Sequence, residues 1–379
     1  MSSGGALVAL TSKGAQDAFL IHEATKPDSA SFFRTKFSRT TNFAQAPRYI
    51  KTISEQDPTI VIPAHGDIIN ALWFEGDHIA TKLFVGSTID LYVGGVKVDS
   101  VKYEFLTDVF TCYLADTWTK SQEINNKVSQ TTEGFVPMQF FFCQPKAFFP
   151  LLACQFHTME VRVTFDGAQL ATLTAAEKQA KCYGNFCFLD TSERAAILAK
   201  PQMDFVIRQV QTFDTNLDTV TDNTNPGGDN SVDLGPLRHP VTSLFWGYRA
   251  STNDAVNDRF TFKQADLLLN GVPIWEKMSP MYFHTVQTYY HSPYGIIQWD
   301  DENQTPYYTR YYAYHFCVDP TKLESSASVN FSRLDHSKLV LTGCEAGSDR
   351  PSNQGLTVFA INFQILRVKD GLCGVLFGS

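Results

Sequence analysis

Short apolar runs recur along the chain, separated by Gly, Asn, Asp or Pro. In the run at 159–165, Val161 and Val163 alternate with polar neighbours, the period-two pattern of a strand with one buried face. Other strand-like runs lie at 67–74, 89–95, 137–143, 241–248, 265–271 and 357–368. Several of them are apolar at successive positions, which predicts inner strands of a sandwich that are buried on both faces.

Helical signals are few. The two best are the segments 174–183 and 191–200. The second is predicted to begin with Thr191 or Ser192 as its cap and to end at Pro201. Both segments lie in the middle of the chain between two strand-rich halves, so they predict the domain boundary.

The two halves resemble one another. DLYVGGVKV at 90–98 parallels DLLLNGVPI at 266–274, and FFC at 141–143 parallels HFC at 315–317. Leu72 in INALWF and Leu244 in VTSLFW form a third match in the same order and at nearly the same spacing. An internal duplication predicts two β sandwiches of one design, each with about eight strands, the size of a jelly roll.

The composition fits a large folded β protein. The chain has 379 residues, of which 44% are hydrophobic and only 18% charged, against a usual ~25%. This excludes disorder, a coiled coil and a highly charged helical array. The 23 Gly and 17 Pro residues are scattered without a period, which excludes a collagen-like sequence and favours frequent turns.

The net charge is −8, and both halves are mildly acidic with no basic patch. Direct binding to a nucleic-acid backbone is therefore not expected. The eight cysteines contain no CxxC pair and are too sparse for a disulfide scaffold, so they are predicted to be buried free thiols in a reducing compartment.

Neither a leader peptide nor a membrane helix is expected. The N-terminal residues 1–16 have too short an apolar part for a signal peptide. The most apolar stretch, 135–156, contains three prolines and a lysine, which is incompatible with ~20 unbroken apolar residues. The chain is expected to be soluble and made in the cytosol.

Candidate chemistry is weak. His284 and His291 flank TVQTYY on a strand-like stretch without a carboxylate at zinc spacing, and Cys182 and Cys187 have no further ligands nearby. The acidic run DDEN at 300–303 could bind Ca²⁺ but is better explained as a solvated loop. No nucleophile elbow, phosphate-binding loop or zinc-protease motif is present, so no catalytic, cofactor-binding or metal residue is predicted, and the chain is not expected to be an enzyme.

Two N-glycosylation sequons are candidate modification sites, one at Asn303 in a polar loop and one at Asn330 inside NFSR. For Asn330 the alternative is ordinary strand packing. A protein made in the cytosol would not meet the secretory glycosyltransferases, so neither sequon is strong.

The segment 214–235 holds five Asp and no basic residue, with a turn predicted at Asn225–Gly228. Its apolar residues are isolated, so it is expected to be a long surface loop and not a strand. We expect it to lie at the outer, solvent-facing end of a barrel. The alternative is contact with a basic patch on a neighbouring assembly.

Several ordered motifs together resemble one family. KGAQDAFL at 13–20 and SFFRTKFSRTTNFA at 31–44 resemble the N-terminal signature of the major capsid proteins of nucleocytoplasmic large DNA viruses, those of algal viruses and iridoviruses among them. Further matches cover nearly the whole chain; they are at 140–165, 185–211, 239–246, 266–271 and 329–341.

This resemblance implies an all-β fold of two tandem eight-stranded antiparallel jelly rolls with a few short helices. The expected division is an N-terminal arm at 1–24, a first roll at 25–185, an inter-domain segment with a short helix at 186–203 and a second roll at 204–379.

The implied function is that of the major structural protein of an icosahedral capsid, assembled in the host cytoplasm as trimeric, pseudo-hexagonal capsomers around an internal membrane. The implied partners are two further copies of the chain, neighbouring capsomers, minor capsid and penton proteins, and the inner viral membrane through the N-terminal arm. No cofactor and no direct contact with nucleic acid are implied.

A glycan-binding or glycan-processing jelly-roll protein is the alternative. The Tyr-rich stretch TPYYTRYYAYH at 305–315 could offer stacking platforms for sugars. A packed strand with alternating Tyr explains the same stretch. A lectin or hydrolase would be a monomer or small oligomer with measurable carbohydrate affinity, whereas a capsid subunit would form trimers and larger assemblies.

Overall fold

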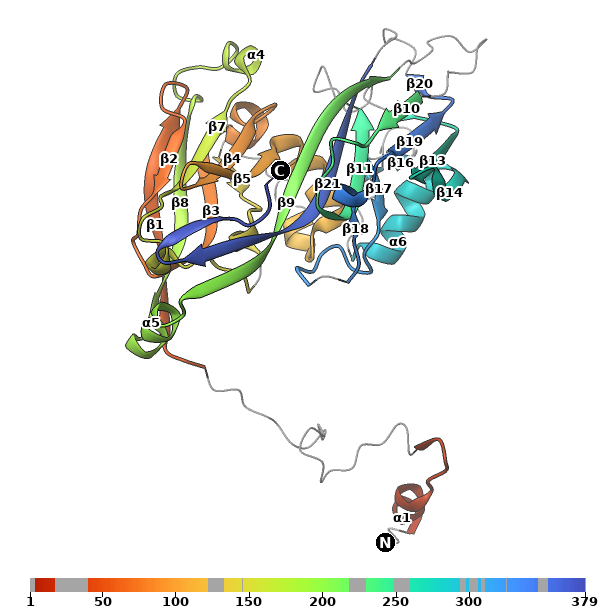
Figure 1. Cartoon of the computed structure of the whole chain (residues 1–379), viewed down its shortest axis with the longest axis horizontal. Coiled ribbons are helices and arrows are strands. Elements are labelled where there is room, and N and C mark those ends of the chain that lie inside the picture. The colour runs from red at the N-terminus through yellow and green to blue at the C-terminus, as the bar shows by residue number, and fades with distance from the viewer. Residues whose placement is uncertain are drawn as a thin grey trace. The chain divides into compact units, whose positions relative to one another are not determined.

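Figure 1 shows the computed structural model of the chain. It describes residues 4–17, 40–121, 133–144, 146–217, 230–248, 260–293, 298–299, 306–307, 311–324, 326–346 and 354–378. The chain divides into two compact units, residues 1–42 and 43–379. The described part of the smaller unit contains helix α1 (Gly4–Thr11), whose side chains are all exposed.

The first half of the larger unit is an antiparallel jelly roll, called here the first roll. Its strands form two four-stranded sheets, in the order β1-β8-β3-β6 and β2-β7-β4-β5. The strands are β1 (Phe43–Ser54), β2 (Thr59–Ile62), β3 (Ile68–Asp77), β4 (Thr88–Val93), β5 (Val96–Lys102), β6 (Glu133–Pro137), β7 (Met159–Thr164) and β8 (Gln179–Leu189).

The second half repeats this order and is called the second roll. One sheet has the order β10-β19-β13-β14; the other, called here the inner sheet, has the order β9-β21-β11-β17. The strands are β9 (Gln202–Leu217), β10 (Asn230–Asp233), β11 (Pro240–Tyr248), β13 (Gln264–Leu269), β14 (Val272–Met278), β17 (Tyr311–His315), β19 (Ser337–Thr342) and β21 (Gln354–Lys369). Short strands add to these; they are β12 (Phe260–Thr261), β15 (Gln298–Trp299), β16 (Pro306–Tyr307), β18 (Val329–Asn330), β20 (Glu345–Ala346) and β22 (Leu372–Val375).

The predicted duplication is confirmed strand by strand. DLYVGG lies on β4 and DLLLNG on β13, and each is the third strand of its sheet and pairs with the next strand in a hairpin. Both hairpin turns place two residues at positive φ, Gly94 and Gly95 in one and Asn270 and Gly271 in the other. Two-residue hairpin turns need this backbone conformation, which is why Gly and Asn recur at these positions.

The helices are short. They are α4 (Gly167–Leu170), α5 (Thr191–Leu198) and α6 (Gln287–His291), together with the π-helical or 3₁₀ segments η1 (Ile79–Leu83), η2 (Phe105–Leu114), η3 (Phe141–Cys143), η4 (Leu151–Ala153), η5 (Tyr282–Val286) and η6 (Phe331–Arg333). The predicted helix at 191–200 is confirmed as α5, but its cap is Asp190, whose carboxylate accepts a hydrogen bond from the Ser192 hydroxyl at 3.1 Å.

Three local predictions were wrong. Residues 174–183 are not a helix: β8 begins at Gln179, because alternate residues such as Ala180 and Cys182 enter the core. The run 137–143 is not a strand: β6 ends at Pro137, and the 3₁₀ turn at 141–143 buries adjacent phenylalanines. The stretch from His284 to His291 is helical, in η5 and α6.

The segment 214–235 is only partly the loop that its composition predicts. Residues 214–217 end β9 and residues 230–233 form β10, while 218–229 lie outside the described residues. Leu217, Val232 and Leu234 are buried in the core of the second roll. Isolated apolar residues that alternate with Asp suit a strand with one buried and one solvent-exposed face.

Three strands of the inner sheet, β11, β17 and β21, are buried on both faces. On one face, Leu244 and Trp246 of β11 and Tyr312 of β17 belong to the core of the second roll. On the other, Phe245, Tyr311 and Phe359 belong to the core of the first roll, which therefore continues across the two halves. This explains why the β11, β17 and β21 sequences are apolar at successive positions.

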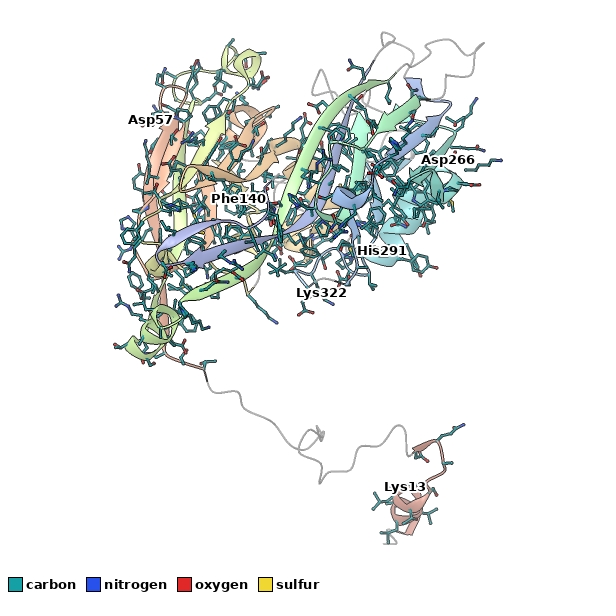
Figure 2. The ribbon with its side chains drawn as sticks, in the orientation of Figure 1. Lys13, Asp57, Phe140, Asp266, His291 and Lys322 are labelled. Carbon is teal, nitrogen blue, oxygen red and sulfur yellow. The ribbon has the colours of Figure 1, made fainter. Side chains whose placement is uncertain are left out.

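The π-helical segment η2 of the first roll supplies much of the contact with the inner sheet. The Phe105 ring lies 5.5 Å from that of Phe359, and the Tyr113 ring 5.7 Å from that of Phe245. The Tyr113 hydroxyl donates to the Tyr311 carbonyl at 2.6 Å. Side chains fill the interior, Phe140 among them (Figure 2).

We predict that Phe359→Ala lowers the free energy of unfolding by about 3–5 kcal/mol, because it leaves a cavity where the two rolls meet. Urea denaturation should show a single transition, shifted for both rolls together. The matched control is Phe43→Ala, since Phe43 is exposed at the start of β1; it should cost less than about 1 kcal/mol. Two separate transitions, only one of them shifted, would contradict a shared core.

Candidate functional site at the junction of the two rolls

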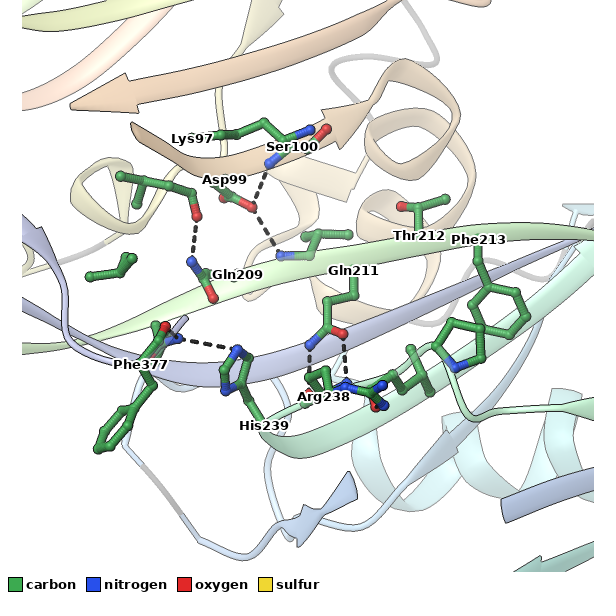
Figure 3. Close-up of a pocket in the computed structure, with 16 residues that line it drawn as sticks. Lys97, Asp99, Ser100, Gln209, Gln211, Thr212, Phe213, Arg238, His239 and Phe377 are labelled. Carbon is green, nitrogen blue, oxygen red and sulfur yellow. Dashed lines mark hydrogen bonds between the residues drawn. The ribbon is translucent and has the colours of Figure 1, made fainter. Parts of the chain in front are cut away.

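A pocket of about 450 Å³ lies where β5 of the first roll meets β9 of the second (Figure 3). The loop before β11 and the end of the chain close its other sides. Its polar lining includes Lys97, Asp99, Gln209, Gln211, Arg238 and His239. This junction pocket gathers titratable side chains from both rolls, which makes it the first place to look for chemistry.

Asp99 is a carboxylate almost completely enclosed by this junction. Its Oδ1 accepts hydrogen bonds from the backbone N–H of Val210 on β9, at 3.0 Å, and of Ser100, at 2.9 Å. Burial raises the pKa of Asp99 to about 7, although these two donors oppose the rise; the nearby charge of Asp90 adds to it and that of Lys97 opposes it.

The side-chain amides beside Asp99 are also engaged in hydrogen bonds, one of which crosses the junction. Gln209 donates from Nε2 to the carbonyl of Val98 on β5 and accepts from Asn362 Nδ2 at 3.2 Å. Gln211 donates to the Arg238 carbonyl at 2.7 Å and accepts from the Arg238 N–H at 2.9 Å. These side chains tie backbones together, so they are not available to bind a ligand.

The far wall of the pocket is held in the same way. Gln364 Nε2 donates to the Phe377 carbonyl at 2.7 Å and lies 3.2 Å from His239 Nε2. Burial lowers the pKa of His239, so this ring is mostly neutral at pH 7. Nearby, Lys102 of β5 forms an ion pair with Asp214 of β9 at 2.8 Å. The arrangement is a polar seam that joins two rolls and provides no nucleophile with a base.

The structure does not assemble a metal site from the predicted histidines and cysteines. His284 is buried, and His291 Nδ1 lies 3.0 Å from the Val318 carbonyl. Cys182 and Cys187 are five positions apart on β8, so they point to opposite faces of the strand. Within the described ranges, no group of three or more His, Cys, Asp or Glu side chains is placed to hold a metal ion.

The two sequons have different outcomes. Asn303, like the acidic run at 300–303, lies outside the described residues. Asn330 is exposed, and its Oδ1 accepts from the Ser332 N–H at 3.0 Å, which caps η6. Its side chain is thus accessible but already has a structural role, and its glycosylation stays a prediction.

The Tyr-rich stretch supports the packed-strand interpretation where it is described. Tyr311 and Tyr312 of β17 are fully buried, each on one face of the inner sheet. A buried ring cannot stack on a sugar. The described tyrosines at 311–312 therefore give no support to the glycan-binding alternative.

Sequence reasoning missed two features. No pattern identified Asp99, since a lone Asp between strand residues looks like an outward-facing position. It also missed the exposed apolar residues of β14, Val272 at 65% and Ile274 at 49% exposure. The sequence did contain a signal for them. Two apolar residues at alternate positions just after a turn lie on the same face of a strand, and on an edge strand that face can be exposed.

None of the helices in the described part of the chain has the length and apolar character needed to cross a bilayer.

The raised pKa of Asp99 predicts a pH dependence. In the unfolded chain this carboxyl has its ordinary pKa of 3.8, so between pH 4 and 7 the folded state binds more protons. Stability should therefore fall as the pH rises through this window, by roughly 4 kcal/mol if Asp99 acted alone. Asp99→Asn keeps the acceptor oxygen but cannot ionise, so it should flatten this part of the profile.

Urea denaturation of the wild type and of Asp99→Asn at several pH values between 4 and 8 measures the effect. Asp57→Asn, at the surface of the first roll, is the matched control and should keep the wild-type profile. Superimposable profiles for wild type and Asp99→Asn would show that Asp99 does not titrate in this window.

Comparisons with known proteins match this geometry. A family model described as large eukaryotic DNA virus major capsid protein matches residues 193–374, and one described as major capsid protein N-terminus matches residues 31–197. The major capsid protein of Pyramimonas orientalis virus is 26% identical, and the alignment covers 99% of this chain and all of the relative. That of Paramecium bursaria Chlorella virus 1 is 24% identical with the same coverage.

The fold is likewise that of a solved capsid protein. The crystal structure of PBCV-1 VP54 matches with a TM-score of 0.76 at 20% identity, over 92% of this chain and all of that one. The two family models adjoin at the segment between β8 and β9 and together cover both rolls. The chain therefore belongs to the major capsid protein family of large eukaryotic DNA viruses.

Proposed function

We propose that the chain assembles as a trimeric, pseudo-hexagonal capsomer that tiles an icosahedral shell around an internal membrane. The observation that carries this proposal is the identical strand order of the two rolls in one compact unit. Three such chains around a threefold axis present six nearly equivalent barrels, which is a hexagonal outline. Family membership supports the capsid role, and the geometry of the repeat supports the outline.

The rest of the proposal follows the family resemblance. Residues 1–24 act as an arm directed to the inner membrane, and the segment with α5, between the end of β8 at Leu189 and the start of β9 at Gln202, links the two roll domains. Neighbouring capsomers and the minor capsid and penton proteins are the partners, no nucleic acid is bound directly, and assembly takes place in the host cytoplasm. The net charge of −8 supports a shell that does not touch the genome.

We place the contact between subunits at the two ends of the two-roll body. Figure 1 shows β1 and β2 at one end and β13, β14 and α6 at the other, and Figure 2 labels Asp57 and Asp266 at these ends. β14 is an edge strand, and the exposed Val272 and Ile274 on it are the kind of apolar edge that associates with another chain.

The opposite end of the body offers an apolar surface of its own. Tyr49 of β1 and Val61 of β2 are both about half exposed. A head-to-tail contact between β14 of one copy and the β1–β2 end of the next closes into a ring. Pro273 on β14 has no N–H to donate, so this contact relies on side-chain packing more than on an added strand.

Sedimentation of the purified chain tests the oligomeric state. The expected species has three times the 42.4 kDa mass of the chain, and negative-stain electron microscopy should show hexagonal plates one trimer wide. The family geometry and the apolar ends account for this result. A clean species of the mass of one chain at micromolar concentration would contradict the trimer.

A variant tests the proposed contact. Ile274→Asp places a charge on the apolar edge of β14, and burying it unpaired should weaken association at least about 30-fold. Sedimentation at several concentrations measures the loss. Val206→Asp is the matched control, since Val206 is a similarly exposed apolar residue on a different strand, β9. Equal effects of the two substitutions would show that β14 is not the contact.

A further inference from the structure

Two cysteines that are far apart in the sequence meet at the boundary between the rolls. Cys154 directly follows η4 in the first roll, and Cys373 lies on β22, the last strand of the second. Their side chains are 8% and 3% exposed and belong to the same core cluster. The two side chains are close enough for each thiol to shift the pKa of the other, and both cysteines are free thiols.

The backbones that carry this thiol pair are held together on both sides. The Phe156 N–H donates to the Gly371 carbonyl at 3.0 Å. His157 Nδ1 lies 2.8 Å from the carbonyl oxygen and 3.2 Å from the amide nitrogen of Cys373, while Cys154 Sγ donates to the His157 carbonyl at 3.5 Å. The two backbone segments that carry the thiols are therefore held together by the fold.

The two sulfurs are chemically unequal. The interaction with the Cys373 thiol lowers the pKa of the Cys154 thiol. The same interaction raises the pKa of Cys373, and burial and the charge of Cys154 add to the rise. Cys154, which is also the more exposed of the two, is thus the one that can ionise and attack first.

We propose that Cys154 and Cys373 are a redox pair that closes into a disulfide and locks the C-terminal hairpin, β21 with β22, to the first roll. The oxidant is a small disulfide such as oxidised glutathione. The Cys154 thiolate attacks one sulfur of the oxidant, forms a mixed disulfide and releases one thiol. Cys154 in the mixed disulfide has no charge and no thiol to raise the pKa of Cys373, so Cys373 loses its proton, attacks the Cys154 sulfur and releases the second thiol. The protein loses two hydrogen atoms and the oxidant is reduced to two thiols.

The disulfide would bridge two backbone segments that already contact one another, as the geometry of a disulfide requires. The bond would stay open in a reducing compartment and close after release from the cell. It would close a loop of more than half the chain, and a cross-link over so long a loop restricts the unfolded state strongly.

A second pair of buried thiols provides an internal comparison. Cys143 and Cys182 are close enough for the charge of Cys143 to raise the pKa of Cys182. Burial raises the pKa of Cys143 to about 12 and also raises that of Cys182, so neither forms the thiolate that exchange requires. This pair should stay reduced under the same conditions.

The test is oxidation of the full-length wild-type protein, purified under reducing conditions, with oxidised glutathione. Alkylation in denaturant should then find six free thiols where the reduced protein has eight, and the intact mass should fall by two hydrogen atoms. Peptide mapping without reductant should identify one cross-link, between Cys154 and Cys373. The thermal midpoint of the oxidised protein should be higher by ~5 °C and return on reduction.

Variants separate this pair from the other thiols. Cys154→Ser and Cys373→Ser should each abolish the cross-link and the rise in thermal midpoint, while Cys182→Ala should retain both. If a serine variant does not fold, peptide mapping of the wild type still decides. Eight free thiols after oxidation, a lasting glutathione adduct on Cys154, or a cross-link at Cys143 and Cys182 would each overturn the proposal.

Discussion

The burial of β11, β17 and β21 of the inner sheet on both faces is the constraint on which the rest of this structure depends. A jelly roll normally needs only one apolar face per sheet, with the other face in water. Here the face of β11, β17 and β21 that would be wet is covered by η2 and the core of the first roll. The two rolls are therefore held at a fixed angle by packing, as a subunit that tiles a shell requires.

Polar contacts also determine how the two rolls are positioned on one another. Asp99, Gln209 and Lys102 join β5 and β9 at defined points, so the rolls cannot slide along the apolar surface without breaking buried hydrogen bonds. The junction pocket, in which titratable groups from both rolls converge, is thus part of the scaffold. This agrees with the structural, non-enzymatic role of the family, as the sequence predicts.

The sequence predicted the architecture better than the local details. Hairpin turns such as Gly94–Gly95 and alternating runs such as that at 159–165 are local signals of strands. Because the two halves are similar, a strand predicted in one half supported the corresponding strand in the other. The segment at 174–183 was misjudged because its helix-favouring residues are overridden by alternate burial along β8. Pairings across the chain, such as Asp99 with Val210 or Cys154 with Cys373, have no local signature, since they depend on where two distant strands meet.

Native-state hydrogen exchange of the full chain, resolved strand by strand in increasing denaturant, tests the central claim most directly. Unfolding of either roll alone would expose an apolar face of the inner sheet. The amides of β11 and β21 should therefore exchange through an opening with the same free energy as the opening that exposes the amides of β3 and β8 in the first roll. Exchange of β3 and β8 through a separate, cheaper opening that leaves β11 and β21 protected would contradict a single body with one continuous core.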